Sequence, residues 1–227
     1  MVVARRKAGK KAIPGVPKSA RPAAIIEDAS VRERMLDTAI GLMSAQGYAG
    51  TSVLDIVESV GVAPPTLYWY FKSKRGILAA AMQRGAEDWM RRMPQPETLP
   101  GATPRERFLS AAKIGGTELR REPQFLRLLI RLSLERAIDD EAVRKTVLDV
   151  RRRVRSWLVA VLQNCWPALP LKDATQLASL QMAVGDGWIV AREIEGTGDS
   201  PISDLVGSFI ADRAENISRM QAPRRRR

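Results

Sequence analysis

The 227-residue chain has no histidine, and cysteine occurs once, at Cys165. Histidine is the commonest metal ligand and the usual general base near neutral pH, so its absence argues against most zinc sites and against Ser-His-Asp or Cys-His catalysis. A single cysteine cannot form an internal disulfide, which is typical of the reducing cytoplasm. The sequence therefore predicts a cytoplasmic protein that is not an enzyme and that holds no metal and no cofactor.

Long apolar runs are also missing. None approaches the roughly 18 residues that a membrane span needs, and no segment has the features of a signal peptide. Strand-like alternation, a Walker-type loop and a nucleotide-binding fingerprint are absent as well. Hydrophobic residues nevertheless make up 45% of the chain, enough for a sizeable core. These observations predict an all-α protein with no membrane partner.

Acidic residues are lacking at both ends of the chain. Residues 1–24 carry seven lysines and arginines without an acid, and Arg224 to Arg227 add four more basic residues, so most of the net charge of +12 lies in the two tails. The first segment is rich in proline and glycine, and we expect it to be disordered. Mobile basic tails attract phosphate without sequence preference, although a merely solubilising tail is the alternative.

Helical patterns begin at Ser30. Ser30–Glu33 (Ser-Val-Arg-Glu) has the form of a capping box, and apolar residues then recur at three- and four-residue spacing up to Gly47, which ends this first helix. Thr51 or Ser52 caps a second, short helix whose apolar residues face inward. Two helices of this kind are the beginning of a small helical domain.

Residues 60–71 have the form of a helix-turn-helix. Gly61 suits the tight turn, and a third helix opens near Ala63, where two prolines are tolerated because the first helical turn has unpaired N–H groups anyway. Leu67 and Phe71 lie four residues apart and face the core, so the aromatic residues between them are left outside. Exposed aromatics in a chain with only 5% aromatic residues need a surface to touch. An ordinary packing unit with half-buried aromatics is the alternative.

Residues 30 to about 80 resemble the N-terminal domain of the TetR (tetracycline repressor) family. The resemblance is carried by Val62–Lys74 (VAPPTLYWYFKSK), together with Ser73-Lys74-Arg75, which opens a fourth helix. It implies a recognition helix that enters the major groove of DNA, used twice by a two-fold dimer on a roughly palindromic operator. Over the rest of the chain it extends only to length and helical character.

Carried over by position, the resemblance implies ten residues that contact DNA. Two at the start of the second helix would meet phosphate, five on the third would face the groove, and three would clamp the backbone. In that order they are Thr51 and Ser52; Ala63, Pro64, Pro65, Thr66 and Tyr68; and Trp69, Tyr70 and Lys74. Since few of these offer hydrogen bonds to bases, we expect specificity to depend on thymine-methyl contacts from Pro65 and Tyr68 and on DNA shape.

Beyond residue 75 every pattern is helical. We therefore divide the chain into a disordered basic tail (1–29), a helix-turn-helix DNA-binding domain (30–75), a helical ligand-binding and dimerisation domain (76–220) and a second basic tail (221–227). The resemblance implies that the last two helices form a homodimer, although they could merely close the subunit's own core.

The middle helices would enclose a pocket for a small-molecule effector. Its candidate lining residues are Phe125, Leu129, Trp157, Met182 and Asp186, although plain core is the simpler interpretation of each. Asp186, between two glycines, could meet a cationic ligand or mark an irregular helix. Arg151–Arg155 is interpreted as a solvated helix face rather than a second basic site.

The sequence thus predicts a ligand-responsive, sequence-specific transcription regulator, associated with the nucleoid and by the family's usual mode a repressor. It would bind a palindromic operator as a dimer and leave it when a small molecule binds. The alternative is a nonspecific DNA-coating protein that uses its basic tails around a helical dimer core. An enzyme is much less favoured, because the densest acidic cluster, residues 139–141, has neither histidine nor a glycine-rich loop beside it.

Overall fold

The computed structural model describes residues 24–121, 123–135, 140–196 and 202–221, and within these ranges the chain forms helices and no strand. The all-α prediction is therefore confirmed. The helices are α1 (Ala24–Gly50), α2 (Val53–Val60), α3 (Pro64–Phe71), α4 (Lys74–Arg92), the short 3₁₀ helix η1 (Pro96–Thr98), α5 (Pro104–Arg121), α6 (Pro123–Leu134), α7 (Glu141–Cys165), α8 (Leu171–Glu195) and α9 (Ile202–Gln221). Among the described residues no helix has both the length and the apolar character that crossing a membrane requires.

Helix α1 begins earlier than the sequence pattern predicts. It starts at Ala24, so residues 24–29, expected in the disordered tail, are helical, and Ser30 lies inside the helix rather than at its cap. The segment 24–29 contains neither proline nor glycine and includes the strong helix formers alanine and glutamate, so nothing stops the helix at Ser30. The predicted end is confirmed, because the backbone leaves the helical conformation at Gly47 (φ 88°). The basic segments 1–23 and 222–227 lie outside the described residues.

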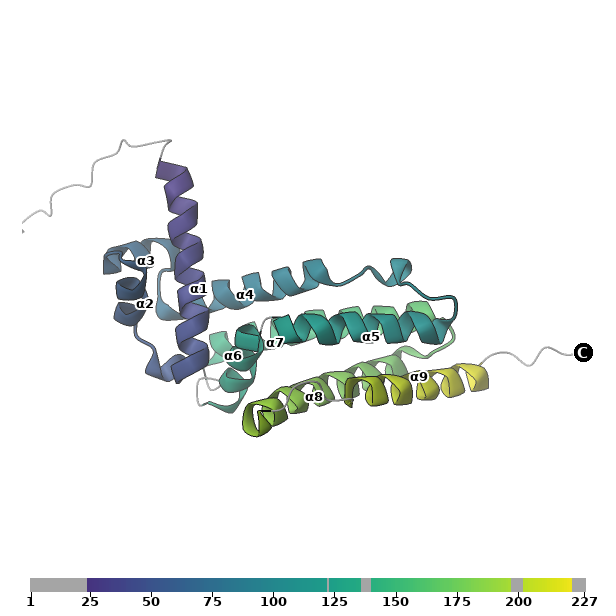
Figure 1. Ribbon diagram of the computed structural model, residues 1–227. Helices are drawn as coiled ribbons and strands as arrows, with labels where there is room; N and C mark the ends of the chain where they lie inside the picture. Colours follow the sequence, from purple (N-terminus) through teal and green to yellow (C-terminus); the bar gives the residue numbers. More distant parts are fainter. Residues whose placement is uncertain (1–23, 122, 136–139, 197–201, 222–227) are drawn as a thin grey trace, which may run out of the picture.

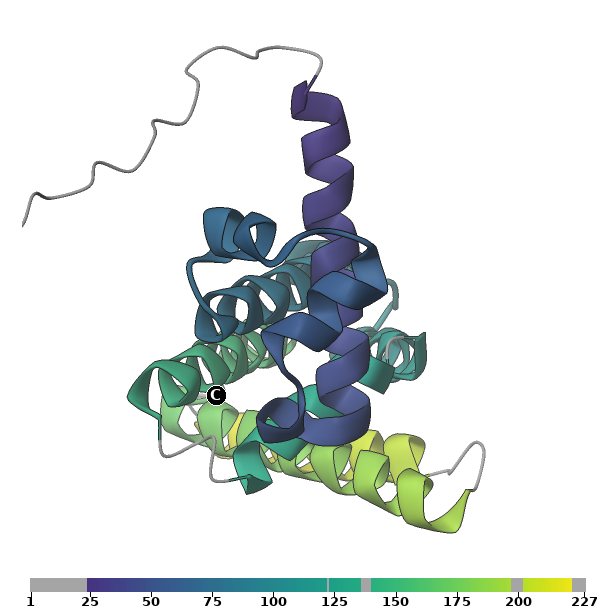
Figure 2. The ribbon, with the colours of Figure 1, turned by 90° about the vertical axis from the view of Figure 1, so that its left-hand side faces the viewer.

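The first three helices and the later long ones occupy different parts of the molecule. α1, α2 and α3 lie together at one end, and α4, α5, α7, α8 and α9 extend away from them (Figure 1). Figure 2 looks onto the end that carries the first three helices. α6 packs against α1, α7 and α8, so it lies where the two parts meet.

Two hydrophobic cores fill the molecule, and α4 and α7 contribute to both. The first joins side chains of α1, α2 and α3 to Phe125 and Leu129 of α6 and to the first half of α7. The second contains Trp89 and Trp157 and continues into α5, α8 and α9. Because the helix-turn-helix shares its core with α6 and α7, the division predicted at residue 75 does not coincide with a division of the core.

Candidate functional site

The N-terminus of α2 has the local structure that its sequence favours. Ser52 is the N-cap: its hydroxyl accepts from the Asp55 N–H (3.0 Å) while its own N–H donates to the Asp55 carboxylate (2.7 Å). The backbone N–H of Ser52, and after it the Ser52 side chain, lowers the pKa of Asp55 by hydrogen bonding to its carboxylate. Ser52 is exposed, as a phosphate contact requires.

Thr51 differs from the prediction. Its side chain is 1% exposed, and its hydroxyl donates to the Gly47 carbonyl oxygen at 2.8 Å. The hydroxyl therefore closes the turn that follows α1 and is not free to meet phosphate. Sequence reasoning treated Thr51 and Ser52 alike because both are common helix caps, and only the fold distinguishes them.

The turn between α2 and α3 has the predicted geometry. Gly61 adopts the left-handed conformation (φ 78°), and the N–H groups of Gly61 and Val62 both donate to the Val57 carbonyl at 2.9 Å. Ala63 is the N-cap of α3, and the two prolines fill its first turn, where no intrahelical donor is needed.

Helix α3 has one buried side and one exposed side. Leu67 and Phe71 are 0% and 6% exposed and hold the helix to the core, whereas Tyr68 and Trp69 are 48% and 64% exposed. Tyr70 is half-buried, and its ring meets that of Trp69 edge-on at 4.6 Å between centroids. The structure brings the other predicted groove-facing residues to the same short helix or its cap: Ala63 and Pro65 are exposed, and Pro64 and Thr66 are half-buried.

A tight turn joins α3 to α4. Lys72 is the one non-glycine residue of the described chain with positive φ (65°), and its Nζ donates to the Trp69 carbonyl at 3.2 Å. The Nζ of Lys74 lies 4.3 Å from the centre of the Tyr48 ring. Burial lowers the pKa of Lys74, opposed by the carboxylates of Asp55 and Glu135. Lys74, predicted to clamp the DNA backbone, is thus already held against α1.

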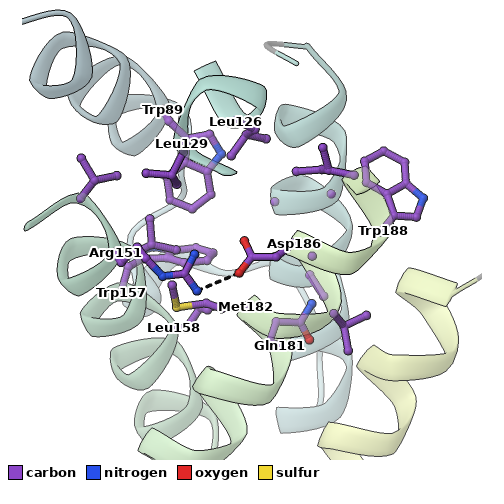
Figure 3. A pocket seen from close by; sticks show the side chains of 18 of the residues that line it. Trp89, Leu126, Leu129, Arg151, Trp157, Leu158, Gln181, Met182, Asp186 and Trp188 are labelled. Carbon is purple, nitrogen blue, oxygen red and sulfur yellow. Dashed lines mark hydrogen bonds and ion pairs between the residues drawn. The ribbon is translucent and has the colours of Figure 1, made fainter. Parts of the chain in front are cut away.

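A cavity of about 130 Å³ lies among α4, α5, α6, α7 and α8. Most of its lining is apolar and aromatic, as Figure 3 shows. All of the predicted pocket residues are among those that line it: Phe125, Leu129, Trp157, Met182 and Asp186. The described residues contain no cluster of three or more metal-ligating side chains, there or elsewhere.

Asp186 forms an ion pair across this cavity. Its Oδ2 accepts from Nη2 of Arg151 on α7 at 2.8 Å, and the two side chains are only 35% and 26% exposed (Figure 3). The interpretation of Arg151 as solvated helix surface is therefore wrong, while its neighbours Arg152 and Arg153 are exposed. The helical pattern could not reveal the pair, because its partners lie on different helices.

Two further polar residues of the cavity were missed. Trp89 lines it and is 7% exposed, and its indole Nε1 has no hydrogen-bond partner among the described residues. The buried side-chain oxygen of Gln181, another lining residue, also lacks a partner there. In the sequence Trp89 and Gln181 look like ordinary positions of amphipathic helices, so no local signal identifies them.

Helix α6 connects the cavity to the helix-turn-helix. It carries the lining residues Phe125 and Leu129, and two residues after Leu129 it carries Arg131. Nη1 of Arg131 donates to the carbonyl oxygens of Ala45 (2.7 Å) and Ser44 (3.3 Å) near the end of α1. A displacement of α6 would therefore disturb its hydrogen bonds to α1.

Comparisons with known proteins agree on the kind of protein. A profile described as bacterial regulatory proteins, tetR family, matches residues 35–81. The regulator BetI of Rhizobium meliloti (strain 1021), named an HTH-type transcriptional regulator, is 27% identical over 76% of this chain and 81% of its own length. The HTH-type transcriptional repressor ComR of Escherichia coli (strain K12) is 42% identical over 53 residues, 23% of this chain and 25% of that protein.

Solved structures extend the likeness in fold to the long helices. A TetR-family transcriptional regulator from Agrobacterium tumefaciens superimposes with a TM-score of 0.64 over 82% of this chain and 98% of its own, at 19% identity. These relatives are transcriptional regulators rather than enzymes. With a helix-turn-helix of this geometry, residues 35–81 match the tetR family of bacterial regulatory proteins, and the chain as a whole is similar in fold to TetR-family transcriptional regulators.

Proposed function

We propose that this regulator binds a roughly palindromic operator as a homodimer and releases it when a small molecule enters the cavity among α4–α8. The observation that carries the proposal is the exposed face of α3. Tyr68 and Trp69 are 48% and 64% exposed although both carry large aromatic rings, and they stand on a helix whose other side is anchored by Leu67. A rigid aromatic face on a helix-turn-helix is suited to base methyl groups and sugar edges in the major groove.

Readout on this face would depend on few hydrogen bonds. Ala63 and Pro65 are exposed beside Tyr68 and offer apolar contact only through their side chains. Such contacts favour thymine methyl groups, and DNA shape would supply the remaining selectivity. Ser52, exposed at the N-terminus of α2, and Lys74 would fix the helix against the phosphates.

Dimer formation is supported by the surface of the last two helices. In the described part of the chain, Ile194 on α8 is 79% exposed, and Leu205 and Phe209 on α9 are 71% and 57% exposed. Large apolar side chains at such exposure are stabilised when a second copy covers them. Two copies related by a two-fold axis would present two α3 helices, which a palindromic operator matches.

Release by a ligand is supported by the cavity and by α6. The cavity residues Phe125 and Leu129 lie on the helix that holds α1 through Arg131. A ligand that binds better when α6 is displaced would favour a conformation in which the two α3 helices no longer match the operator. Repression is the favoured mode, because ComR is named a repressor.

A mobility-shift titration tests the proposal. The full-length protein and a variant without residues 1–24 are titrated, at two salt concentrations, against DNA that flanks the protein's own gene, with excess competitor DNA. We expect a discrete, competitor-resistant shift with both proteins. A smear that disappears with the tail would favour nonspecific coating instead, because basic tails bind phosphate without sequence preference.

The Tyr68→Ala variant tests the readout. We expect it to relax the preference at one thymine of each half-site by about tenfold, the discrimination that one good base contact provides, while the rest of the operator preference remains. Unchanged selectivity across all single-base variants of the operator would contradict the assignment of Tyr68 to the groove.

A further inference from the structure

We infer that the ligand of the cavity is a small organic anion: a carboxylate on a body about the size of one aromatic ring, held by Arg151. This inference deepens the proposed function and rests on it for the regulatory role of binding. It concerns the chemical class of the ligand, which the charges, the unpartnered groups and the size of the cavity together define.

The charges of the cavity favour an anion. Its lining contains two arginines, Arg120 and Arg151, and one carboxylate, Asp186. Asp186 accepts one hydrogen bond from the Arg151 guanidinium, donated by Nη2. A guanidinium offers five N–H donors in a planar fork, so Arg151 can keep this ion pair and bind a second carboxylate.

One of the two unpartnered groups of the cavity residues favours a ligand with hydrogen-bond acceptors. The indole Nε1 of Trp89 can only donate, it is buried, and it has no partner among the described residues. Leaving a buried donor unpaired is unfavourable, and a ligand oxygen that reached it through a shift of the indole ring would gain affinity. The unpartnered atom of Gln181 is its buried side-chain oxygen, which accepts and would need a donor from the ligand, so it does not by itself favour an anion.

The size and lining of the cavity define the rest of the ligand. Its volume is about 130 Å³, close to that of cavities known to hold a single benzene ring. Trp89 and Trp157 meet edge-on there, with 5.8 Å between ring centroids, and Leu129 and Met182 line the same space. An aromatic or branched body therefore fits better than a polar one.

A cationic ligand is the alternative that Asp186 and the aromatic rings raise. It would have to displace Arg151 from Asp186 or lie beside it, and either arrangement places two positive groups in a confined, partly buried space. In our assignment Asp186 instead positions Arg151, holding its guanidinium over the cavity. The two alternatives predict opposite effects of neutralising Asp186.

Three probes with the same body and different charge test the inference on the full-length protein. Phenylacetate, phenylacetamide and phenethylammonium are titrated while tryptophan fluorescence is recorded, since Trp89 and Trp157 line the cavity. We expect phenylacetate to bind about tenfold more tightly than either of the others, the factor that one charge-assisted hydrogen bond supplies. Equal affinities, strongest binding of phenethylammonium, or no saturable binding of any probe would overturn the inference.

Variants identify the groups responsible. Arg151→Met should reduce phenylacetate affinity about tenfold to that of the amide, whereas Arg152→Met, an exposed position on the same helix, should leave it unchanged. Asp186→Asn should leave phenylacetate binding intact or tighten it a few-fold, because the asparagine side-chain oxygen can still accept from Arg151 while the competing negative charge is removed. Loss of phenethylammonium binding in Asp186→Asn, with that binding unaffected in Arg151→Met, would assign the cavity to cations.

Operator release is measured separately, in the mobility shift. Charge-selective binding that depends on Arg151, without release of DNA, would support the ligand class and contradict the effector role in the proposed function. Release of the operator by a cationic or neutral compound that binds better than phenylacetate would support the effector role and contradict the ligand class.

Discussion

The molecule holds two groups of aromatic residues in opposite environments. On α3, Tyr68 and Trp69 are 48% and 64% exposed, whereas around the cavity Trp89 and Trp157 are 7% and 8% exposed. The first pair stands at consecutive positions of one eight-residue helix, and the second pair is brought together from α4 and α7. An exposed face of this kind depends on local backbone geometry, while the cavity depends on the packing of several long helices. Substitutions in the two regions should therefore affect different properties.

The largest expected effect separates the regions directly. Trp157→Ala removes a buried ring that packs edge-on against Trp89 and donates to the Pro94 carbonyl at 3.0 Å. We expect the free energy of unfolding to fall by about 3–5 kcal/mol, as for other large-to-small substitutions in a core. Urea denaturation measures it.

Trp69→Ala is the matched control for that prediction. Because Trp69 is 64% exposed, its removal should change stability by no more than about 0.5 kcal/mol. It should instead weaken operator binding about tenfold, as truncation of an aromatic anchor at an interface does. If Trp69→Ala destabilised the fold as much as Trp157→Ala, the exposed face would be part of the core and the comparison would fail.

The next largest effect on stability is expected at Gly76, which lies against the end of the recognition helix α3. Gly76 lies where a Cβ atom would overlap the carbonyl oxygen of Phe71, the last residue of α3. Glycine to alanine within a helix normally stabilises by about 1 kcal/mol, but here the overlap with backbone should outweigh that gain and cost about 2 kcal/mol net. Gly41→Ala in α1, where a Cβ would meet nothing within 4 Å, is the control and should show the gain. Equal stabilities of the two variants in urea would contradict this account.

The difference between local backbone geometry and the packing of distant helices also explains how far the sequence predicts the structure. The turn at Gly61, the cap at Ser52 and the division of α3 into buried and exposed positions follow from residues close in the chain, and the structure confirms them. The start of α1 was predicted wrongly from nearby residues. The capping-box sequence at Ser30 competes with good helix formers before it, and the helix starts at Ala24. The pairing of Arg151 with Asp186 joins α7 to α8 across the cavity, and no local pattern encodes such a contact.

Arg131 links the two regions, and its removal should weaken that link. Arg131→Ala loses the bonds to the Ala45 and Ser44 carbonyls, which should cost about 1 kcal/mol and reduce operator affinity a few-fold, because α1 is held less firmly. Arg127→Ala on the same helix loses an ion pair to Glu193 of α8 instead and should leave operator affinity unchanged. Urea denaturation and the mobility shift measure the two properties. A comparable loss of operator affinity in both variants would show that α6 does not act through α1.

The smallest effect is a pH dependence of stability that arises at the N-terminus of α2. The N–H of Ser52 donates to the Asp55 carboxylate and, with the Ser52 hydroxyl, lowers the pKa of Asp55 below its unfolded value. The ionised carboxylate therefore stabilises the fold at pH values above the unfolded pKa, near 3.9, and this contribution disappears as the pH falls through the lower pKa of the folded state. Asp55→Asn should be less stable than the unsubstituted chain at pH 6, and the difference should vanish at acid pH.

Glu58→Gln is the control for the Asp55 prediction, because the Glu58 side chain lies on the same helix and has no hydrogen bond or ion pair within the described residues. It should show no such difference at either pH. A difference for Asp55→Asn that persisted unchanged in acid would mean that the cap acts through the shape of the side chain rather than its charge. The stability of α2 would then be independent of pH, as is the apolar packing of Trp89 against Trp157.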